Sequence, residues 1–311
     1  MRSIQRSPGT PPKAKIMIIG TRGSRLALWQ AHFVQAQLKD LGIDSELKII
    51  KTQGDRVQHL TFDKLEGKGF FTKEIEDHLL DGTIDLAVHS LKDMPTDQPE
   101  GLTLAALSYR AAVNDVLVIN KDKAVPGKPF QLADGATVGT SSARRKAQLR
   151  DLHPGLVPVD IRGNVPTRLE KARTGEMDAV MLAAAGLERL ELDLSDMVVV
   201  RPSPKEFVPA PGQGVMAIQT RKDAIAIRKQ LAPLHNVTVG ECTNVERTIL
   251  SLMEGGCSMP LGVYCDRDDV GNYHVWAAYA ETHDSEVKRV QLSLSTRDGL
   301  AERVVASLRP A

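Results

Sequence analysis

The chain has 311 residues, with 40 basic and 39 acidic side chains and a formal net charge of +1, so no strong overall field draws it to nucleic acid. Hydrophobic residues make up 42% of the chain and aromatic residues only 4%, so we expect cores of Leu, Ile, Val and Ala, and exclude disordered, collagen-like and disulfide-framework proteins. The three cysteines cannot all pair, and no apolar run approaches the ~20 residues of a membrane span, which predicts a soluble, cytoplasmic protein.

The opening residues, 1–15, are basic and rich in Pro and Ser but lack the apolar core of a secretory signal. We expect a disordered leader there, with a remnant of an organelle-targeting segment as the alternative. Strands and helices then alternate, which indicates βαβ units and a parallel or mixed sheet. In chain order the patterns predict a strand over 16–20, a helix from 21 to a left-handed cap at Gly42, a strand over 45–52, a helix from Phe71 to Gly82 and a strand over 84–88.

The polar stretch 54–69 has no clear period and is long for a loop in a compact domain, as functional lids and disordered segments are. The alternation restarts after Asn114, and a crossing segment with prolines from 202 to 211 leads to a strand over 215–219. Two α/β lobes joined by extended crossovers predict a hinged cleft. The second lobe is predicted to hold strands over 115–119, 137–139, 157–161 and 178–182 and helices over 142–152 and 165–173.

The pattern changes again from about Leu234. A long helix over about 241–253 precedes three strands and a last helix from Gly299. Apolar residues alternate over 273–279 and 290–294, which is typical of a sheet with one solvated face, so we predict a small α+β third domain. The predicted division is domain 1 over 16–112 plus 213–232, domain 2 over 113–212 and domain 3 over 233–311.

Three predicted strand-to-helix junctions, at 20–24, 139–145 and 162–168, place small or hydroxyl residues beside arginine. A helix N-terminus attracts anions, and guanidinium groups add bidentate capture of carboxylate or phosphate. Capping plus a solvated basic face would explain one such junction, but three at one structural position predict a cleft that binds a polyanion. The chain lacks a P-loop, a strand-linked GxGxxG motif and aromatic residues interleaved with the basic ones, so a small polycarboxylate fits better than a nucleotide or RNA.

The segment His89-Ser-Leu-Lys-Asp93 follows a predicted strand at the sheet edge where open α/β sheets bind ligands. Lys92 and Asp93 could form a surface ion pair, but opposite an anion-binding lobe Asp93 would meet a cationic centre or move a proton. His89 is expected to be a core histidine whose ring is satisfied by backbone groups. No set of His, Cys, Asp and Glu has metal-ligand spacing, so no metal is predicted.

Cys257 follows two glycines after the long helix and lies among polar residues, whereas Cys242 and Cys265 are expected to be small buried hydrophobes. A nucleophile or an attachment point is one interpretation of Cys257, and an inert thiol is the other, since no His–Asn partnership is visible.

Taken together, the motifs resemble the porphobilinogen deaminase (hydroxymethylbilane synthase) family. They occur in the family's order across about residues 16 to 300, and the joint match is specific although no single motif is. The matching segments are Gly20-Thr-Arg-Gly-Ser-Arg-Leu-Ala-Leu-Trp-Gln30, Gly67-Lys-Gly-Phe-Phe-Thr-Lys-Glu74, Val88-His-Ser-Leu-Lys-Asp93, Val138-Gly-Thr-Ser-Ser-Ala-Arg-Arg145, Ile161-Arg-Gly-Asn-Val-Pro-Thr-Arg-Leu169, Leu182-Ala-Ala-Ala-Gly-Leu-Glu-Arg-Leu190, Pro211-Gly-Gln-Gly214 and Leu252-Met-Glu-Gly-Gly-Cys257.

The resemblance implies three domains, of which the first two are lobes like type II periplasmic binding proteins around a cleft. It implies a transferase of tetrapyrrole biosynthesis that carries a dipyrromethane cofactor as a thioether on Cys257. Four porphobilinogen molecules are added head to tail, each losing ammonia, before hydrolysis releases hydroxymethylbilane. Every pyrrole brings an acetate and a propionate, which accounts for the arginines. The family also implies a monomer with a small-molecule substrate and no nucleic-acid or membrane partner.

The resemblance also assigns roles residue by residue. Asp93 matches the catalytic aspartate, 54–69 the mobile lid, and the departures at Ala143 and Pro166 remove no charge. The cofactor binders carried over are Ser24, Lys92, Asp93, Thr140, Ser141, Ser142, Arg144, Arg145, Arg162, Gly163 and Arg168, besides Cys257. The substrate binders carried over are Arg22, Ser24, Phe71, Arg162, Arg168, Arg189 and Gln213.

Two rival functions remain beside this one. A two-lobed binding or sensor module for a small anion would share the cleft and the arginines, but would have no use for Lys92-Asp93 or for Cys257 after its two glycines. An RNA-binding protein would need more aromatic residues and a larger positive charge.

Overall fold

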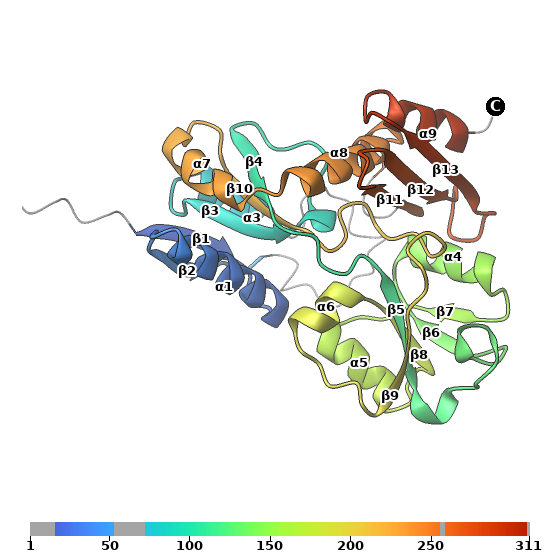
Figure 1. The fold of residues 1–311 in the computed structure, drawn as a ribbon. Helices are drawn as coiled ribbons and strands as arrows, with labels where there is room; N and C mark the ends of the chain where they lie inside the picture. The colour runs from blue at the N-terminus through green and yellow to red at the C-terminus, as the bar shows by residue number, and fades with distance from the viewer. Residues whose placement is uncertain (1–15, 53–71, 256–258, 310–311) are drawn as a thin grey trace, which may run out of the picture.

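The computed structural model describes residues 16–52, 72–255 and 259–309, and these form three sheets (Figure 1). Two sheets have five strands each and the third has three. The chain runs through the first sheet, crosses to the second, returns to the first, and finishes in the third. No helix in the described ranges is long and apolar enough to span a bilayer.

The first sheet has the strand order β2-β1-β3-β10-β4 and is mixed, because β10 runs antiparallel to both of its neighbours. Helices α1 and α7 cover one face, where Val34 and Leu38 pack on Ile19 and Val88, and α3 covers the other. The bounds are β1 Met17–Thr21, α1 Arg25–Asp40, β2 Ser45–Ile49, α3 Lys73–Leu80, β3 Leu86–Ser90, β4 Leu102–Leu107, β10 Met216–Arg221 and α7 Ile225–Leu231.

The second sheet repeats this plan with the order β7-β6-β8-β5-β9, and β5 is its antiparallel strand. Each sheet therefore takes its antiparallel strand, β10 or β5, directly after the chain has crossed from the other sheet. Helices α5 and α6 pack on one face and α4 on the other. The bounds are β5 Asp115–Asn120, β6 Thr137–Gly139, α4 Ala143–Leu152, β7 Val157–Val159, α5 Val165–Arg173, β8 Ala179–Ala183, α6 Ala184–Arg189 and β9 Met197–Val200.

The third sheet is an antiparallel meander, β11-β12-β13. Its buried face packs on α8 and α9, where Cys242 and Cys265 are buried free thiols, as expected from the sequence. The bounds are α8 Val237–Leu252, β11 Leu261–Arg267, β12 Tyr273–Tyr279, β13 Lys288–Leu294 and α9 Leu300–Leu308. Gly42 and Gly299 both adopt positive φ, so the predicted left-handed cap after α1 is confirmed.

The structure corrects several predicted bounds. The strand expected over 45–52 ends at Ile49, and the one expected over 84–88 runs from Leu86 to Ser90. Helix α8 begins at Val237 rather than near 241, because Asn236 caps it by accepting a hydrogen bond from the Val239 N–H. The prediction placed the start too late because Gly240 interrupts the helical pattern of the sequence. Elements β4, β9, α6 and α7 were not predicted. The polar stretch 54–69 lies outside the described residues.

Candidate active site

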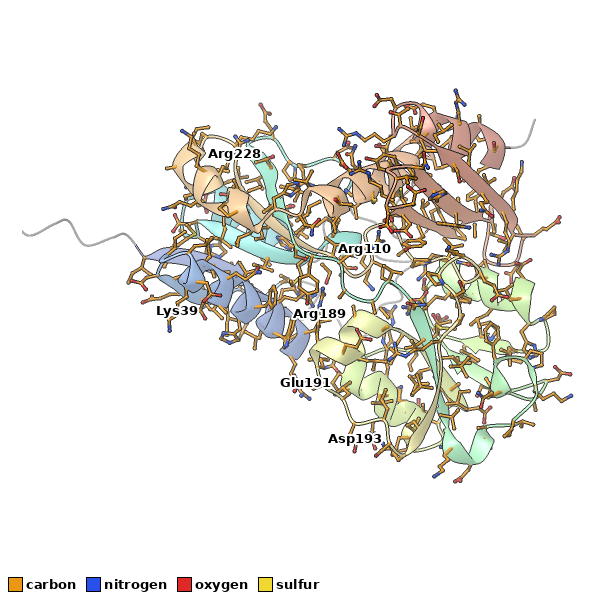
Figure 2. All side chains as sticks on the ribbon, in the orientation of Figure 1. Lys39, Arg110, Arg189, Glu191, Asp193 and Arg228 are labelled. Atoms are coloured by element: carbon orange, nitrogen blue, oxygen red, sulfur yellow. The ribbon has the colours of Figure 1, made fainter. Side chains whose placement is uncertain are left out.

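Two adjoining pockets share Leu26 and Ser90 in their walls; the first is lined from both lobes, and the second by residues of the first lobe. The first pocket is basic, and Arg189, which lines it, lies between α6 and α1 (Figure 2). The second contains Asp93. The first pocket is lined by Lys92, Arg145, Arg168, Arg189 and Gln213, and the second by Arg22, Ser24, His89 and Asp93, among others.

A buried ion cluster underlies the basic pocket. Asp115, at the start of β5, accepts a hydrogen bond from Arg144 Nη1 at 2.6 Å on Oδ2 and one from Arg145 Nη2 at 2.7 Å on Oδ1. Burial alone would raise the pKa of the Asp115 carboxyl, but the charges of the two guanidinium groups and their hydrogen bonds hold it well below its usual range. The Asp115 carboxylate is thus the shared counter-ion of Arg144 and Arg145.

Within residues 16–52, 72–255 and 259–309, the other cations of the basic pocket, Lys92, Arg168 and Arg189, form no such ion pair. Burial, and then the charges of Arg145 and Arg162, lower the pKa of Arg168 to about 10. Burial also lowers the pKa of Lys92, although the Asp93 charge opposes the shift. Arg189 donates from Nη2 to the Gly214 carbonyl at 2.8 Å, while its buried Nε has no hydrogen-bond partner among the described residues. The described lining of the pocket thus carries four cations and no acid, and a ligand rich in carboxylates would supply negative charge.

The side chains of Lys92 and Asp93 extend from one short turn, Leu91–Asp93, into different pockets. Lys92 lines the basic pocket, where its Nζ donates to Gln213 Oε1 at 3.5 Å, and Asp93 is exposed in the second pocket. Gln213 in turn donates from Nε2 to Asp115 Oδ1 at 3.0 Å. No ion pair joins Lys92 to Asp93 in the described part of the chain, so the surface ion pair considered from the sequence is not found.

Similarity to known proteins shows the family of the chain. Residues 17–229 match a family model described as porphobilinogen deaminase, dipyromethane cofactor binding domain. This chain belongs to the porphobilinogen deaminase family. It is 47% identical over 254 residues to the probable porphobilinogen deaminase of Methanocella arvoryzae, covering 81% of this chain and 80% of that protein. It is 42% identical over 257 residues to the porphobilinogen deaminase of Neisseria meningitidis serogroup A, covering 82% and 81%.

Among solved structures the chain is similar to the second substrate-binding domain of a putative amino acid ABC transporter from Streptococcus pneumoniae, with a TM-score of 0.45, 15% identity, and coverage of 70% of this chain and 91% of that one. The predicted α/β class is confirmed by the two five-stranded mixed sheets and the small three-stranded α+β unit, and the transferase class and the dipyrromethane cofactor of the family are confirmed as well. The roles of individual residues stay predictions.

The structure brings together about half of the residues to which the family resemblance gave a role. Those that line the two pockets are Arg22, Ser24, Lys92, Asp93, Arg145, Arg168, Arg189 and Gln213. Those that line neither pocket are Thr140, Ser141, Ser142, Arg144, Arg162 and Gly163. Phe71 and Cys257 lie outside the described residues.

The hydroxyl groups at the start of α4 all form hydrogen bonds with the backbone. Ser142 caps the helix by accepting from the Arg145 N–H, and Thr140 Oγ1 accepts from the Ser142 N–H at 3.3 Å. Ser141 Oγ donates to the Ile161 carbonyl at 2.8 Å and accepts from the Ile161 N–H at 3.0 Å. These bonds build the junction between β6 and α4, so the geometry gives these three residues a local structural role.

His89 differs from its prediction. Its Nε2 is buried without a hydrogen-bond partner among the described residues, so the expectation that backbone groups satisfy the ring is wrong at this nitrogen. Burial lowers the pKa of His89 to about 4, with the side chain of Gln219 opposing the shift and the charge of Arg22 adding to it. The imidazole is therefore neutral at physiological pH.

Sequence reasoning missed two residues of the site. Asp115 was read only as the start of a strand, although an acid heading the apolar run Val116–Ile119 was a signal for a buried charge that needs partners. Ser90 lines both pockets and accepts a hydrogen bond from Gln30 Nε2 at 2.9 Å. It lay inside the quoted motif between His89 and Lys92, but nothing in its type distinguished it.

Proposed function

We propose that this chain condenses four porphobilinogen molecules head to tail onto a dipyrromethane held covalently by Cys257, releasing ammonia at each addition and hydroxymethylbilane by hydrolysis. The family match supports this reaction class, and the basic pocket beside an exposed carboxylate carries the proposal for the site. Each pyrrole brings two carboxylates, which is the charge that the pocket lacks.

The donor set fits the cofactor. Lys92, Arg145, Arg168 and Arg189 present cationic donors from both lobes to one pocket, so they would bind the acetate and propionate groups of the first rings. When bound, dipyrromethane supplies the pyrrole carbon that accepts the first added unit. Arg144 acts beneath the pocket, since its Nη1 donates to Asp115 and to the Val208 carbonyl.

Asp93 is the proposed catalytic residue. Its exposed carboxylate shares the second pocket with Arg22 and Ser24, which would bind the carboxylates of the incoming porphobilinogen. There the carboxylate would accept hydrogen bonds from pyrrole N–H groups and stabilise the positive charge that develops as ammonia leaves. It would also hold the proton that the departing amine takes up. Thr140, Ser141, Ser142, Arg162 and Gly163, which precede α4 and α5, are proposed as further cofactor binders, and Arg162 also as a substrate binder.

The finer organisation belongs to the same proposal. We assign residues 16–112 with 213–232, residues 113–212 and residues 233–311 to three domains, which agrees with the membership of the three sheets. A monomer that works in the cytoplasm without nucleic acid or membrane fits the near-neutral charge and the two buried free thiols.

The intact mass of the purified protein tests the covalent assignment. Protein from cells that make porphobilinogen should be heavier than its sequence by two linked pyrrole units and should turn pink with acidic aldehyde reagent. Cys257→Ser should lose both signals, whereas the matched controls Cys242→Ser and Cys265→Ser should keep them. An unmodified wild-type mass would contradict the assignment.

A further inference from the structure

Arg247, on α8, contacts the segment that follows the Lys92-Asp93 turn. Its Nη1 donates to the carbonyls of Leu91 at 3.4 Å and Met94 at 3.0 Å. Its Nη2 donates to the carbonyls of Pro95 at 2.5 Å and Thr96 at 3.3 Å. One guanidinium group from the third sheet's long helix thus binds four carbonyl groups between residues 91 and 96.

This segment has little structure of its own. The turn Leu91–Asp93 is a single 3₁₀ turn, closed by the Met94 N–H donating to the Leu91 carbonyl at 3.1 Å. Carbonyl groups at the end of so short a turn need outside donors, and proline at 95 removes one N–H that could have served the chain. A planar guanidinium group can reach several carbonyls at once, which an ammonium group does less well.

The backbone that carries Arg247 is itself held firmly. The preceding residue, Glu246, is fully buried and pairs with Arg110, with Oε1 2.7 Å from Arg110 Nη1. Glu246 also accepts from the Gly212 N–H at 2.7 Å and the Cys265 N–H at 2.8 Å. Arg110 and Gly212 belong to the two crossing segments between the lobes, and Figure 2 shows Arg110 beside α8. Arg247 therefore reaches the turn from a point fixed to both crossings and to β11.

We propose that Arg247 is a positioning residue for the condensation: it holds segment 91–96 so that Lys92 faces the basic pocket and Asp93 faces the second pocket. Arg247 lines neither of the two pockets and bonds the backbone of the turn, so its effect on the site would pass through the turn. The proposal rests on the function proposed above. Removing the Arg247 guanidinium group should change carboxylate binding by the pocket arginines little, but it should let the Asp93 carboxylate move away from its position in the second pocket.

The test uses full-length holoprotein loaded with cofactor, and compares Arg247→Gln and Arg247→Lys with the wild type. The matched control is Arg309→Gln, because Arg309 Nη2 also donates to a backbone carbonyl, that of Leu252 at 2.7 Å, at the C-terminal residue of the same helix and outside segment 91–96. We measure KM and the single-turnover rate of the first enzyme–substrate complex. Arg247→Gln should slow that rate by about 10- to 100-fold with a smaller change in KM, since a displacement of about 1 Å costs up to about 10²-fold. Arg247→Lys should fall between it and the wild type, and Arg309→Gln should match the wild type.

A double-mutant cycle separates positioning from general damage. In an Asp93→Asn background, Arg247→Gln should slow the first step less than threefold further, because a residue that acts through Asp93 has little left to lose. An equal fold-loss in both backgrounds, or a wild-type rate for Arg247→Gln, would overturn the proposal. If Arg247→Gln does not load with cofactor, Arg247→Lys decides: a reduced rate supports positioning and a wild-type rate refutes it. A wild-type protein that forms no complex with porphobilinogen would refute the proposed function instead.

Discussion

Replacing Asp115 by Asn should destabilise the protein strongly, because it removes the one charge that two buried guanidinium groups share. The Asp115 side chain is 0% exposed, and those of Arg144 and Arg145 are 6% and 8% exposed. Asn keeps the volume and one accepting oxygen but leaves both cations without a buried counter-charge. Breaking a buried pair by removing one partner costs about 3–5 kcal/mol, a large share of a typical stability of about 5–15 kcal/mol.

Urea unfolding at pH 7 measures this loss. The folded-state pKa of Asp115 is depressed, so its stabilising effect is fully present above its unfolded pKa of about 3.9 and is lost only as pH falls through the lower folded value. With an m-value of up to about 3 kcal/mol/M, the midpoint should fall by at least about 1 M.

The matched control for Asp115→Asn is Asp160→Asn. Asp160 lies 3.0 Å from Lys146, but its side chain is 61% exposed, so losing this ion pair should cost under about 1 kcal/mol. The reasoning about the buried cluster fails if Asp115→Asn lies within about 1 kcal/mol of the wild type.

Two further predictions concern titration and chemistry. The pKa of His89 is lowered to about 4 in the folded protein, so below about pH 6.5 the unfolded chain takes up a proton that the folded protein does not. This should lower the free energy of unfolding of the wild type by about 2 kcal/mol between pH 7 and pH 5. Urea unfolding of His89→Gln at both pH values should show a smaller loss. In single-turnover kinetics on cofactor-loaded protein, Asp93→Asn should slow the first condensation at least about 10²-fold with little change in affinity, whereas Lys92→Gln should mainly weaken binding. A near wild-type rate for Asp93→Asn would return that residue to a structural role.

The alternation of strands and helices could be predicted from sequence because it depends on local pattern. Apolar runs closed by glycine located β1 and β6, and the helix at 165–173 was predicted with its observed bounds. Strand β9 and helix α6 were missed because each is short, with four and six residues, and α6 follows β8 without a break. A continuous apolar stretch gives no sign of where a buried strand becomes a buried helix.

The site was harder to predict because its charges depend on long-range partners. Nothing local separates Arg145, which lines the basic pocket, from Arg144, which does not, although both donate to Asp115. The bonds of Arg247 span more than 150 residues of sequence, so no motif could show them. The motifs predicted which residues belong to the site, but the fold was needed to show which of them line the pockets and which do not.

The net charge of the chain likewise gave no sign of how charge is distributed around the site. The whole chain carries +1, yet one pocket is lined by Lys92, Arg145, Arg168 and Arg189, of which Arg145 pairs with the buried Asp115. Four cations thus line the first pocket, and a dipyrromethane carries four carboxylates, two per ring. Each later ring adds two more carboxylates, so the first pocket alone cannot neutralise a growing chain. Arg22 is the one Lys or Arg side chain in the described lining of the second pocket, so we expect it to be needed for elongation as well as for the first addition.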